Sequence, residues 1–422
     1  MSNDKIIPKV TVIDSIMGSG KTTSAINMIN NSSDDVRFIY ITPYLDEVSR
    51  IIQSCPEKKF KQPRNNGGTK LEDIKNLINK GNNIVSTHAL FKKFNKETIE
   101  LAYINNYVLI MDEVADVVEV YSEEIKENGV DRLIAKEDIG TILEKYAYID
   151  EDTNLLKWTD DFYPDNGVFG NIKRMAKLDS LTLYGEQMFL WLFPIATFKA
   201  FKHIYILTYL FDSQIQKYYY DLFNIKYEKL SAAKVNGEYQ FVKYIENQNI
   251  DNINYEKLIN IIDNDKLNSI GDFDYSLSKN WYKNASKETL NKLKNNIYNF
   301  FYNIAKSKSN ENLWTTFKDY KKQMSGKGYT KGFAPINSRA TNQYINRWAV
   351  AYPVNRFLDP NIKNYFVGHN VNVDENEYAL SEMLQFIWRS AIREGNPISI
   401  YIPSDRMRTM LKKWIYKMCN EV

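Results

Sequence analysis

Residues 15–23 read Ser-Ile-Met-Gly-Ser-Gly-Lys-Thr-Thr and follow directly on the apolar run Val-Thr-Val-Ile at 10–13. Glycines at such a position allow backbone N–H groups to close around phosphate oxygens, while the lysine reaches the β- and γ-phosphates and the next hydroxyl ligates Mg²⁺. A helix beginning near Thr22 adds the positive end of its dipole. The pattern predicts a strand, a phosphate-binding loop and a helix, and therefore an α/β fold that binds a nucleoside triphosphate with Mg²⁺. The predicted nucleotide contacts are Met17, Gly18, Ser19, Gly20, Lys21, Thr22 and Thr23.

One position departs from the full form of this loop. The pattern has glycine six residues before Lys21, where this chain has Ser15. A glycine-rich turn with an unrelated lysine is the alternative, but the apolar strand that precedes the loop favours phosphate binding.

An acidic pair, Asp112 and Glu113, follows the apolar run 107–111 further along the chain. The carboxyl ends of parallel strands meet at one edge of a sheet, so the pair is predicted to lie beside the bound phosphates. Asp112 would hold Mg²⁺, and Glu113 would orient or deprotonate the attacking water. Acids at a helix N-terminus are the alternative explanation. Lys21, Asp112 and Glu113 are thus predicted catalytic residues, and Thr22 and Asp112 predicted metal ligands.

The composition is that of a globular protein. The chain has 422 residues, 44% hydrophobic and 25% charged, which is enough for two or three domains. No run of eighteen apolar residues and no positively charged leader is present, so we expect a cytoplasmic protein without a membrane segment. The two cysteines, Cys55 and Cys419, are far apart, and the histidines, His88, His203 and His369, lack ligand spacing. We expect neither a disulfide framework nor a metal site built from these residues.

Charge is unevenly distributed, although the net charge is only +3. Residues 119–165 contain fourteen acidic and five basic residues, whereas residues 318–356 contain eight basic residues against Asp319 alone. Aromatic residues interleave the basic stretch, which is typical of a nucleic-acid track. A solvated surface is the alternative for both stretches.

Apolar runs of four or five residues alternate with helical segments in the first third of the chain and indicate a parallel sheet with helices on both faces. This alternation stops over residues 119–200, which we interpret as an acidic helical insertion. It resumes with a strand at 203–207. The polar, glycine-containing stretch 231–238 is the predicted linker. The expected domains are 1–230 and 238–422, the second with its own helical insertion at about 245–312.

The order of six segments resembles the motif series of superfamily 2 helicases and translocases of the DEAD/DEAH-like kind: SIMGSGKTT, YITPYLDEV, IVSTHALF, LIMDEV, ILTYLF and QFIWRSAIR. Helicase-type loops often carry a small residue at the position of Ser15. The later segments NSRATNQY and YIPSDRMRTMLKKW resemble helicase-like proteins of phages and mobile elements. The resemblance implies two RecA-like domains, with ATP between them and nucleic acid across their top.

The resemblance also implies contacts to nucleic acid after the second and third strands. These residues are Thr42 and Pro43 after the second strand, and Ser86, Thr87 and His88 after the third. Turn formation and helix capping by Ser and Thr are the alternative.

Two later motifs match the family less closely. The segment 338–342 resembles the motif that touches both ATP and nucleic acid, and adds Arg339, Thr341 and Asn342. The coupling motif of the family is often Ser-Ala-Thr or Thr-Ala-Thr, and this chain has Thr208-Tyr209 in that place. The departure at Tyr209 leaves the coupling role of Thr208 open.

A helix is predicted over residues 378–392, with Gln385, Arg389 and Arg393 at i, i+4 and i+8 on one face. In the second domain this helix face would point toward the nucleotide, and the arginines would neutralise charge on the γ-phosphate. These three residues complete the predicted catalytic set. A solvated basic stripe is the alternative.

The predicted function is an ATP-dependent helicase or translocase that moves along nucleic acid, DNA rather than RNA, with replication or recombination proteins as further partners. A DNA-packaging motor ATPase shares the loop and the acidic pair. A nucleic-acid-dependent ATPase switch or clamp that separates no strands is the third possibility.

Overall fold

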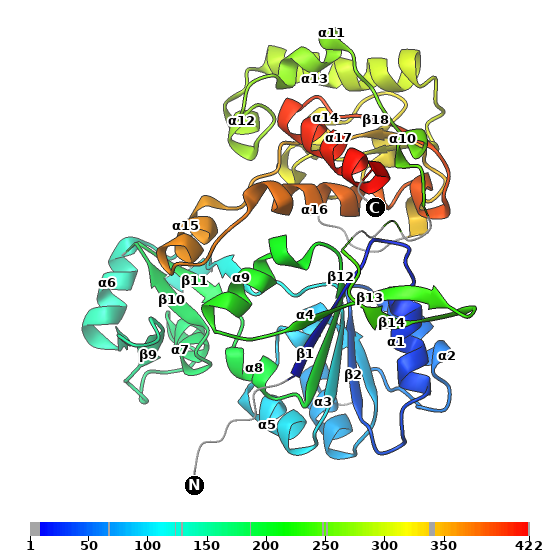
Figure 1. Cartoon of the computed structure of the whole chain (residues 1–422). Coiled ribbons are helices and arrows are strands. Elements are labelled where there is room, and N and C mark those ends of the chain that lie inside the picture. Colours follow the sequence, from blue (N-terminus) through cyan, green and yellow to red (C-terminus); the bar gives the residue numbers. More distant parts are fainter. Residues whose placement is uncertain are drawn as a thin grey trace. The chain divides into compact units, whose positions relative to one another are not determined.

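The structure is a computed structural model that describes residues 9–65, 68–122, 124–127, 130–185, 187–246, 249, 252–336 and 342–420. The chain forms two compact units, each with its own parallel sheet (Figure 1). The first unit contains the residues up to 14, 21–242 and 359–373, and the second contains 15–20, 243–358 and 374–422. The predicted α/β fold with two parallel sheets is confirmed.

The first unit is built on a seven-stranded sheet with the strand order β14-β13-β1-β12-β4-β2-β3. β1 pairs in parallel with β12 up to Asp14 and Thr208, and β12 pairs with β4 up to Leu207 and Asp112. This register brings the carboxyl ends of three strands to one edge of the sheet. The strands are β1 Lys9–Asp14, β2 Phe38–Thr42, β3 Ile84–Thr87, β4 Val108–Asp112, β12 His203–Thr208, β13 Glu228–Val235 and β14 Glu238–Lys243.

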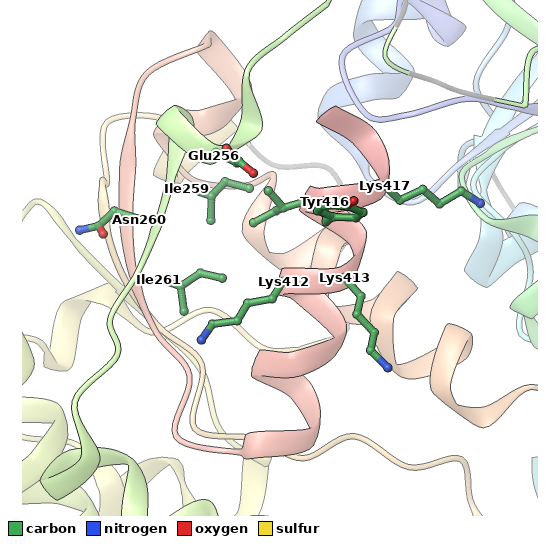
Figure 2. Close-up of a pocket in the computed structure, with 9 residues that line it drawn as sticks. Glu256, Ile259, Asn260, Ile261, Lys412, Lys413, Tyr416 and Lys417 are labelled. Carbon is green, nitrogen blue, oxygen red and sulfur yellow. The ribbon is translucent and has the colours of Figure 1, made fainter. Parts of the chain in front are cut away.

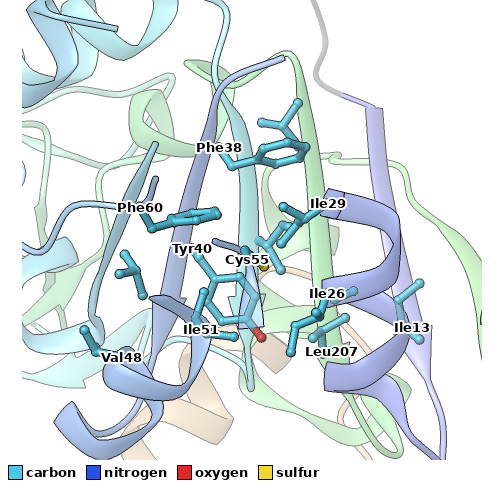
Figure 3. Close-up of a cluster of buried hydrophobic side chains, with 14 of the residues drawn as sticks. Ile13, Ile26, Ile29, Phe38, Tyr40, Val48, Ile51, Cys55, Phe60 and Leu207 are labelled. Atoms are coloured by element: carbon cyan, nitrogen blue, oxygen red, sulfur yellow. The ribbon is translucent and has the colours of Figure 1, made fainter. Parts of the chain in front are cut away.

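Helices cover the sheet because their apolar residues recur at helical spacing. In Figure 3, Ile26 and Ile29 of α1 and Val48 and Ile51 of α2 point to the same buried cluster as Tyr40 of β2. Burial of each such side chain contributes about 1.5–3 kcal/mol. The helices of this unit outside residues 119–200 are α1 Lys21–Asn30, α2 Leu45–Ser54, α3 Lys70–Asn79, α4 His88–Phe91, α5 Lys96–Ile104, η1 Phe211–Ser213, α9 Ile215–Leu222 and α15 Pro360–Gly368.

The predicted linker at 231–238 is wrong, because this stretch lies in the β13–β14 hairpin of the first sheet. Asn236 and Gly237 form its turn with φ of 51° and 89°. Two successive positive φ values define the hairpin turn that Asn-Gly favours. Residues 239–243, assigned from the sequence to the second domain, therefore extend the first sheet.

Residues 119–200 do not form the predicted helical insertion. They contain small antiparallel sheets, such as β10 with β11, in which Leu181 lies opposite Trp191. Alternating apolar residues with tight turns, as at Gly185, favour strands over helices. The elements are β5 Val118–Val120, β6 Glu124–Glu127, β7 Val130–Leu133, α6 Lys136–Lys145, β8 Ala147–Ile149, β9 Leu156–Trp158, α7 Gly170–Lys177, β10 Leu181–Tyr184, β11 Met188–Leu192 and α8 Ile195–Lys199.

The second unit has a parallel four-stranded sheet with the order β15-β18-β17-β16. Its strands are β15 Ile259–Ile261, β16 Asn312–Trp314, β17 Ala349–Ala351 and β18 Ile398–Tyr401. Phe333 is joined to Trp314 of β16 by one isolated bridge. Most of the predicted insertion at 245–312 is helical, but β15 lies within it.

The helices of the second unit are α10 Tyr255–Leu258, α11 Asp265–Asn268, η2 Ser269–Gly271, α12 Lys279–Asn284, α13 Lys287–Asn299, η3 Phe300–Ile304, η4 Lys318–Tyr320, α14 Lys321–Met324, η5 Thr330–Gly332, η6 Asn342–Tyr344, α16 Glu375–Ile387, η7 Ala391–Glu394 and α17 Asp405–Asn420.

Candidate nucleotide-binding site

The loop between β1 and α1 has the backbone that phosphate binding requires. Gly18 and Gly20 both have φ of +85°, a left-handed conformation that glycine adopts without steric cost. Ser19 N donates to Ile16 O at 3.3 Å and closes the turn. A Cβ atom on Gly18 would meet no atom within 4 Å, so the open space beside the loop and the backbone conformation both suit a phosphate.

A hydroxyl at the start of α1 meets a carboxylate at the end of β4. Thr22 Oγ1 at the start of α1 lies 3.5 Å from Asp112 Oδ2 at the end of β4, and Tyr40 Oη lies 3.5 Å from the same oxygen. The predicted metal ligands are therefore brought together. Oxygen ligands of this kind suit Mg²⁺, which is usually held by one or two carboxylates, water and substrate phosphates. Among the residues that the structure describes, no cluster of three or more His, Cys, Asp and Glu forms a separate metal site.

Negative charge dominates around Asp112. The pKa of its carboxyl is raised to about 7, mainly by burial and then by the neighbouring carboxylates of Glu113 and Glu47, while Lys21 and Arg50 lower it. Desolvation and like charge both disfavour ionisation. A divalent cation at this carboxyl would supply the positive charge that the surroundings lack, so the residues fit Mg²⁺.

Glu113 has a strained backbone with φ of 68°. Its N–H donates to Leu207 O at 2.9 Å, and its Oε2 accepts from the Thr208 hydroxyl at 3.3 Å. Non-glycine residues in this region cost about 1–3 kcal/mol and are concentrated at functional sites. Glu113 is thus held away from its relaxed conformation by the strand beside it.

The segment after β12 is anchored to the strand that leads into the loop. Asp14 accepts from the N–H groups of Leu210 at 2.8 Å and Phe211 at 3.2 Å. Leu210 is itself left-handed, with φ of 55°. Burial raises the pKa of Asp14, whereas Lys229 and these two N–H groups lower it. The sequence analysis did not select Asp14, although a carboxylate that ends an apolar strand beside a phosphate loop was the available signal.

Two glutamines at the start of α9 were also missed. Gln216 accepts from Ala115 N at 2.8 Å, just after the acidic pair. Gln214 donates to Tyr209 O at 2.7 Å and lies 3.0 Å from the Thr208 hydroxyl. No local pattern marks these residues, because their partners are distant in sequence or depend on the path of the loop.

The residues predicted to contact nucleic acid after β2 and β3 are partly buried. Thr42 and Ser86 are buried at the strand ends, whereas Pro43 and Thr87 are half-buried. His88 Nε2 is hydrogen-bonded to Asp112 O at 2.8 Å, which links α4 to the acidic pair. Contact between these residues and nucleic acid stays a prediction.

The motif predicted at 338–342 lies largely outside the residues that the structure describes. Arg339 and Thr341 both fall there, and Asn342 begins η6.

The predicted common face of Gln385, Arg389 and Arg393 is wrong, because α16 ends at Ile387. Ser390 Oγ donates to Ile387 O at 2.6 Å and satisfies a carbonyl at the helix end. Arg393 then lies in the short helix η7, so it shares no helix with Gln385.

Arg389 has a structural environment. It is only 2% exposed, and its guanidinium donates to Pro335 O at 2.8 Å and Ile336 O at 3.1 Å. Arg393 is half-buried. The two arginines that the sequence treats alike therefore differ in exposure and contacts.

A cavity of about 870 Å³ lies between β15 and α17 in the second unit (Figure 2). Ile259 and Ile261 line one side and Lys412, Lys413 and Lys417 the other. None of the residues predicted from the sequence to bind nucleotide or nucleic acid lines this cavity.

No helix in the described part of the chain is long and apolar enough to cross a membrane.

The architecture is an α/β fold with two parallel sheets, and it resembles that of a solved protein structure. A solved structure of XPD in its apo form is 12% identical, with a TM-score of 0.51, over 99% of this chain and 96% of that chain. A structure of the XPD helicase is 11% identical, with a TM-score of 0.49, over 99% of this chain and 96% of that chain. At such low identity the first likeness concerns the fold alone.

Sequence comparison gives the family. Residues 253–415 match the model of the YonV C-terminal Rossmann-like domain. The SPbeta prophage-derived uncharacterized protein YonV of Bacillus subtilis strain 168 is 44% identical over 421 residues, which cover 96% of this chain and 98% of that protein. The chain belongs to the YonV family.

Proposed function

We propose that this protein is an ATP-dependent DNA helicase or translocase. The observation that carries the proposal is the meeting of Thr22, in the helix that follows the glycine loop in sequence, with Asp112 next to the strained Glu113. A phosphate loop, a metal-binding carboxylate and a second carboxylate are the parts that phosphoryl transfer to water needs. The helicase-like fold supports coupling of this chemistry to movement on nucleic acid.

Each residue has a proposed role at this site. Lys21 contacts the β- and γ-phosphates, while Thr22 and Asp112 hold Mg²⁺, which would neutralise charge on the phosphates. Glu113 orients the attacking water and accepts its proton. The remaining proposed nucleotide contacts are those of the loop, Met17 to Gly20 and Thr23.

DNA is the proposed track because the relative is prophage-derived and because basic and aromatic residues interleave over 318–356. The proposed contacts include Thr42, Pro43, Ser86, Thr87 and His88, together with Arg339, Thr341 and Asn342. Because Thr42 and Ser86 are buried, their half-buried neighbours Pro43 and Thr87 are the better candidates to contact the DNA strand.

The test is the ATPase rate without nucleic acid and with single-stranded DNA, duplex DNA or RNA. We expect stimulation by DNA and binding that weakens with salt, with a log–log slope of about −0.7 per phosphate contact on single strands. An unstimulated ATPase with salt-independent binding would contradict the proposal.

A nucleic-acid-dependent switch or clamp is the second candidate, and the burial of Arg389 favours it. An arginine that binds two backbone carbonyls is poorly placed to leave them for a phosphate. If the protein is a helicase or translocase, Arg393 rather than Arg389 is the proposed residue that neutralises charge on the γ-phosphate. Arg393→Ala should lower DNA-stimulated turnover on the order of 10³-fold while nucleotide affinity is retained. Normal turnover in Arg393→Ala, and no strand separation by the wild type, would favour the switch.

A further inference from the structure

We infer that Gln214 is a positioning residue that directs the Thr208 hydroxyl proton to Glu113, and so sets the orientation of the carboxylate that acts on water. The inference rests on the proposed ATPase function, and its geometry lies wholly within the first unit. Thr208 and Gln214 are almost completely buried, at 0% and 4% exposure, so solvent cannot replace the hydrogen bonds between them.

The orientation of the Gln214 amide is fixed by Tyr209. A backbone carbonyl only accepts hydrogen bonds, and Tyr209 O lies 2.7 Å from Gln214 Nε2. The amide nitrogen therefore faces this carbonyl, and one of its two hydrogens is used there. The second hydrogen is available to Thr208 Oγ1, which lies 3.0 Å away.

The number of available protons determines which acceptor receives the hydroxyl proton of Thr208. Its hydroxyl has one proton and two acceptors within reach, Glu113 Oε2 at 3.3 Å and Gln214 Oε1 at 3.2 Å. If Gln214 Nε2 donates to Thr208 Oγ1, the hydroxyl is satisfied as an acceptor on that side and its proton is left for the carboxylate. Hydrogen bonds to a charged acceptor are roughly twice as strong as neutral ones, which favours this arrangement.

The position of Gln214 also suggests a role beyond helix capping. It is the residue before α9, yet its side chain makes no capping hydrogen bond and turns back to Thr208 and Tyr209. The same segment is held from the other side by Asp14, which binds the N–H groups of Leu210 and Phe211. The chain thus connects β1, which leads into the phosphate loop, to Glu113 through residues 208–214.

The test uses the full chain with Gln214→Met, which keeps the side chain's size but removes both amide groups, and Thr208→Val, which removes the hydroxyl. We expect Gln214→Met to lower kcat on the order of 10–10²-fold, as misplacement of a catalytic group does, with ATP affinity unchanged. The double variant should be no slower than Thr208→Val alone, because Gln214 acts through Thr208. Lys217→Ala, which removes a half-buried side chain of α9 that pairs with Asp221, is the matched control.

Two further measurements separate positioning from packing. In Gln214→Glu the ionised carboxylate would attract the Thr208 proton away from Glu113, so kcat should fall more steeply with rising pH than in Gln214→Met. A crystal structure of nucleotide-free Gln214→Met should show the Glu113 carboxylate turned away from Thr208 while α9 keeps its place. Thermal unfolding verifies that each variant is folded.

Turnover of Gln214→Met within twofold of wild type, or effects of Gln214→Met and Thr208→Val that simply multiply, would overturn the inference. If the wild type hydrolyses no more ATP than Lys21→Ala, the proposed function fails instead. The crystal structure then still decides the inference, because an unmoved Glu113 in Gln214→Met would contradict it.

Discussion

The two units use their charged residues differently. In the first unit, Asp14, Asp112 and Glu113 gather at neighbouring strand ends, with a raised pKa at Asp112 and a left-handed backbone at Glu113. In the second unit, the guanidinium of Arg389 is tied to two backbone carbonyls. A raised carboxyl pKa and a left-handed backbone therefore mark the first site, whereas hydrogen bonds to backbone carbonyls mark the place of Arg389.

This difference teaches which features indicate chemistry. A buried charged residue that donates hydrogen bonds to backbone carbonyls contributes to the stability of the fold. A carboxyl whose pKa is raised by burial and by like charge needs a cation, and is a better candidate for function. The following changes test that distinction.

The largest effect is expected from Lys21→Ala. Removing the charge that contacts the phosphates should lower ATP turnover on the order of 10³-fold or more, while the fold survives because the Lys21 side chain is only half-buried. Steady-state ATPase and circular dichroism are the measurements, with Lys217→Ala as the control. Near-normal turnover in a folded Lys21→Ala would show that the nucleotide does not bind at this loop.

Glu113→Gln separates metal binding from water activation at the first site. We expect turnover to fall about 10²–10⁴-fold, the usual contribution of a general base, while ATP still binds because Asp112 and Thr22 are intact. Fluorescent-nucleotide binding and ATPase assays check both parts. Loss of ATP binding together with turnover would show that Glu113 is structural or a direct metal partner.

Arg389→Ala should mainly reduce stability. Removal of a buried guanidinium that satisfies two carbonyls should lower the free energy of unfolding by about 3 kcal/mol. Arg393→Ala should change it by less than about 0.5 kcal/mol. Urea unfolding of both variants tests the contrast, which is lost if the two variants are equally stable.

The last effect is a pH dependence of stability from Asp112. Its pKa is about 7 in the folded protein against an ordinary 3.8, so its protonated form is favoured by folding. This contribution is complete below pH 3.8 and is lost as pH rises through about 7, at roughly 1 kcal/mol per pH unit. His203 opposes it, because burial lowers its pKa from 6.5 to about 4 and its contribution is lost as pH falls.

The difference between wild type and Asp112→Asn isolates the carboxyl, because His203 is common to both. Thermal unfolding from pH 4 to 8 should show Asp112→Asn gaining stability relative to wild type as pH rises. A constant difference across this range would mean that Asp112 is not protonated in the nucleotide-free protein.

The sequence predicts those parts of the fold and site that depend on local patterns. The glycines of the loop, the apolar strand before it and the pair Asp112-Glu113 are contiguous signals, and the structure brings Thr22 and Asp112 together as expected. The Asn236-Gly237 turn was also a local signal, but its polar composition resembles a linker.

Other features depend on contacts that no local pattern encodes. Gln214 and Asp14 gain their partners only after β1, β4 and β12 pair in register. The end of α16 at Ile387 follows from the bond of Ser390 to that carbonyl, although the apolar spacing continues to Ile392. Helical periodicity alone therefore extended the helix through Arg389.

The left-handed backbone of Glu113 has a consequence for the history of the family. Glycine relieves such a conformation, and asparagine tolerates it better than glutamate. Natural selection for hydrolysis would therefore keep an unfavourable residue at this position, since most other ways of relaxing it remove the carboxylate. A relative that no longer hydrolyses ATP can accept Gly or Asn at this position and become more stable. The residue at this single position therefore offers a way to tell active relatives from inactive ones.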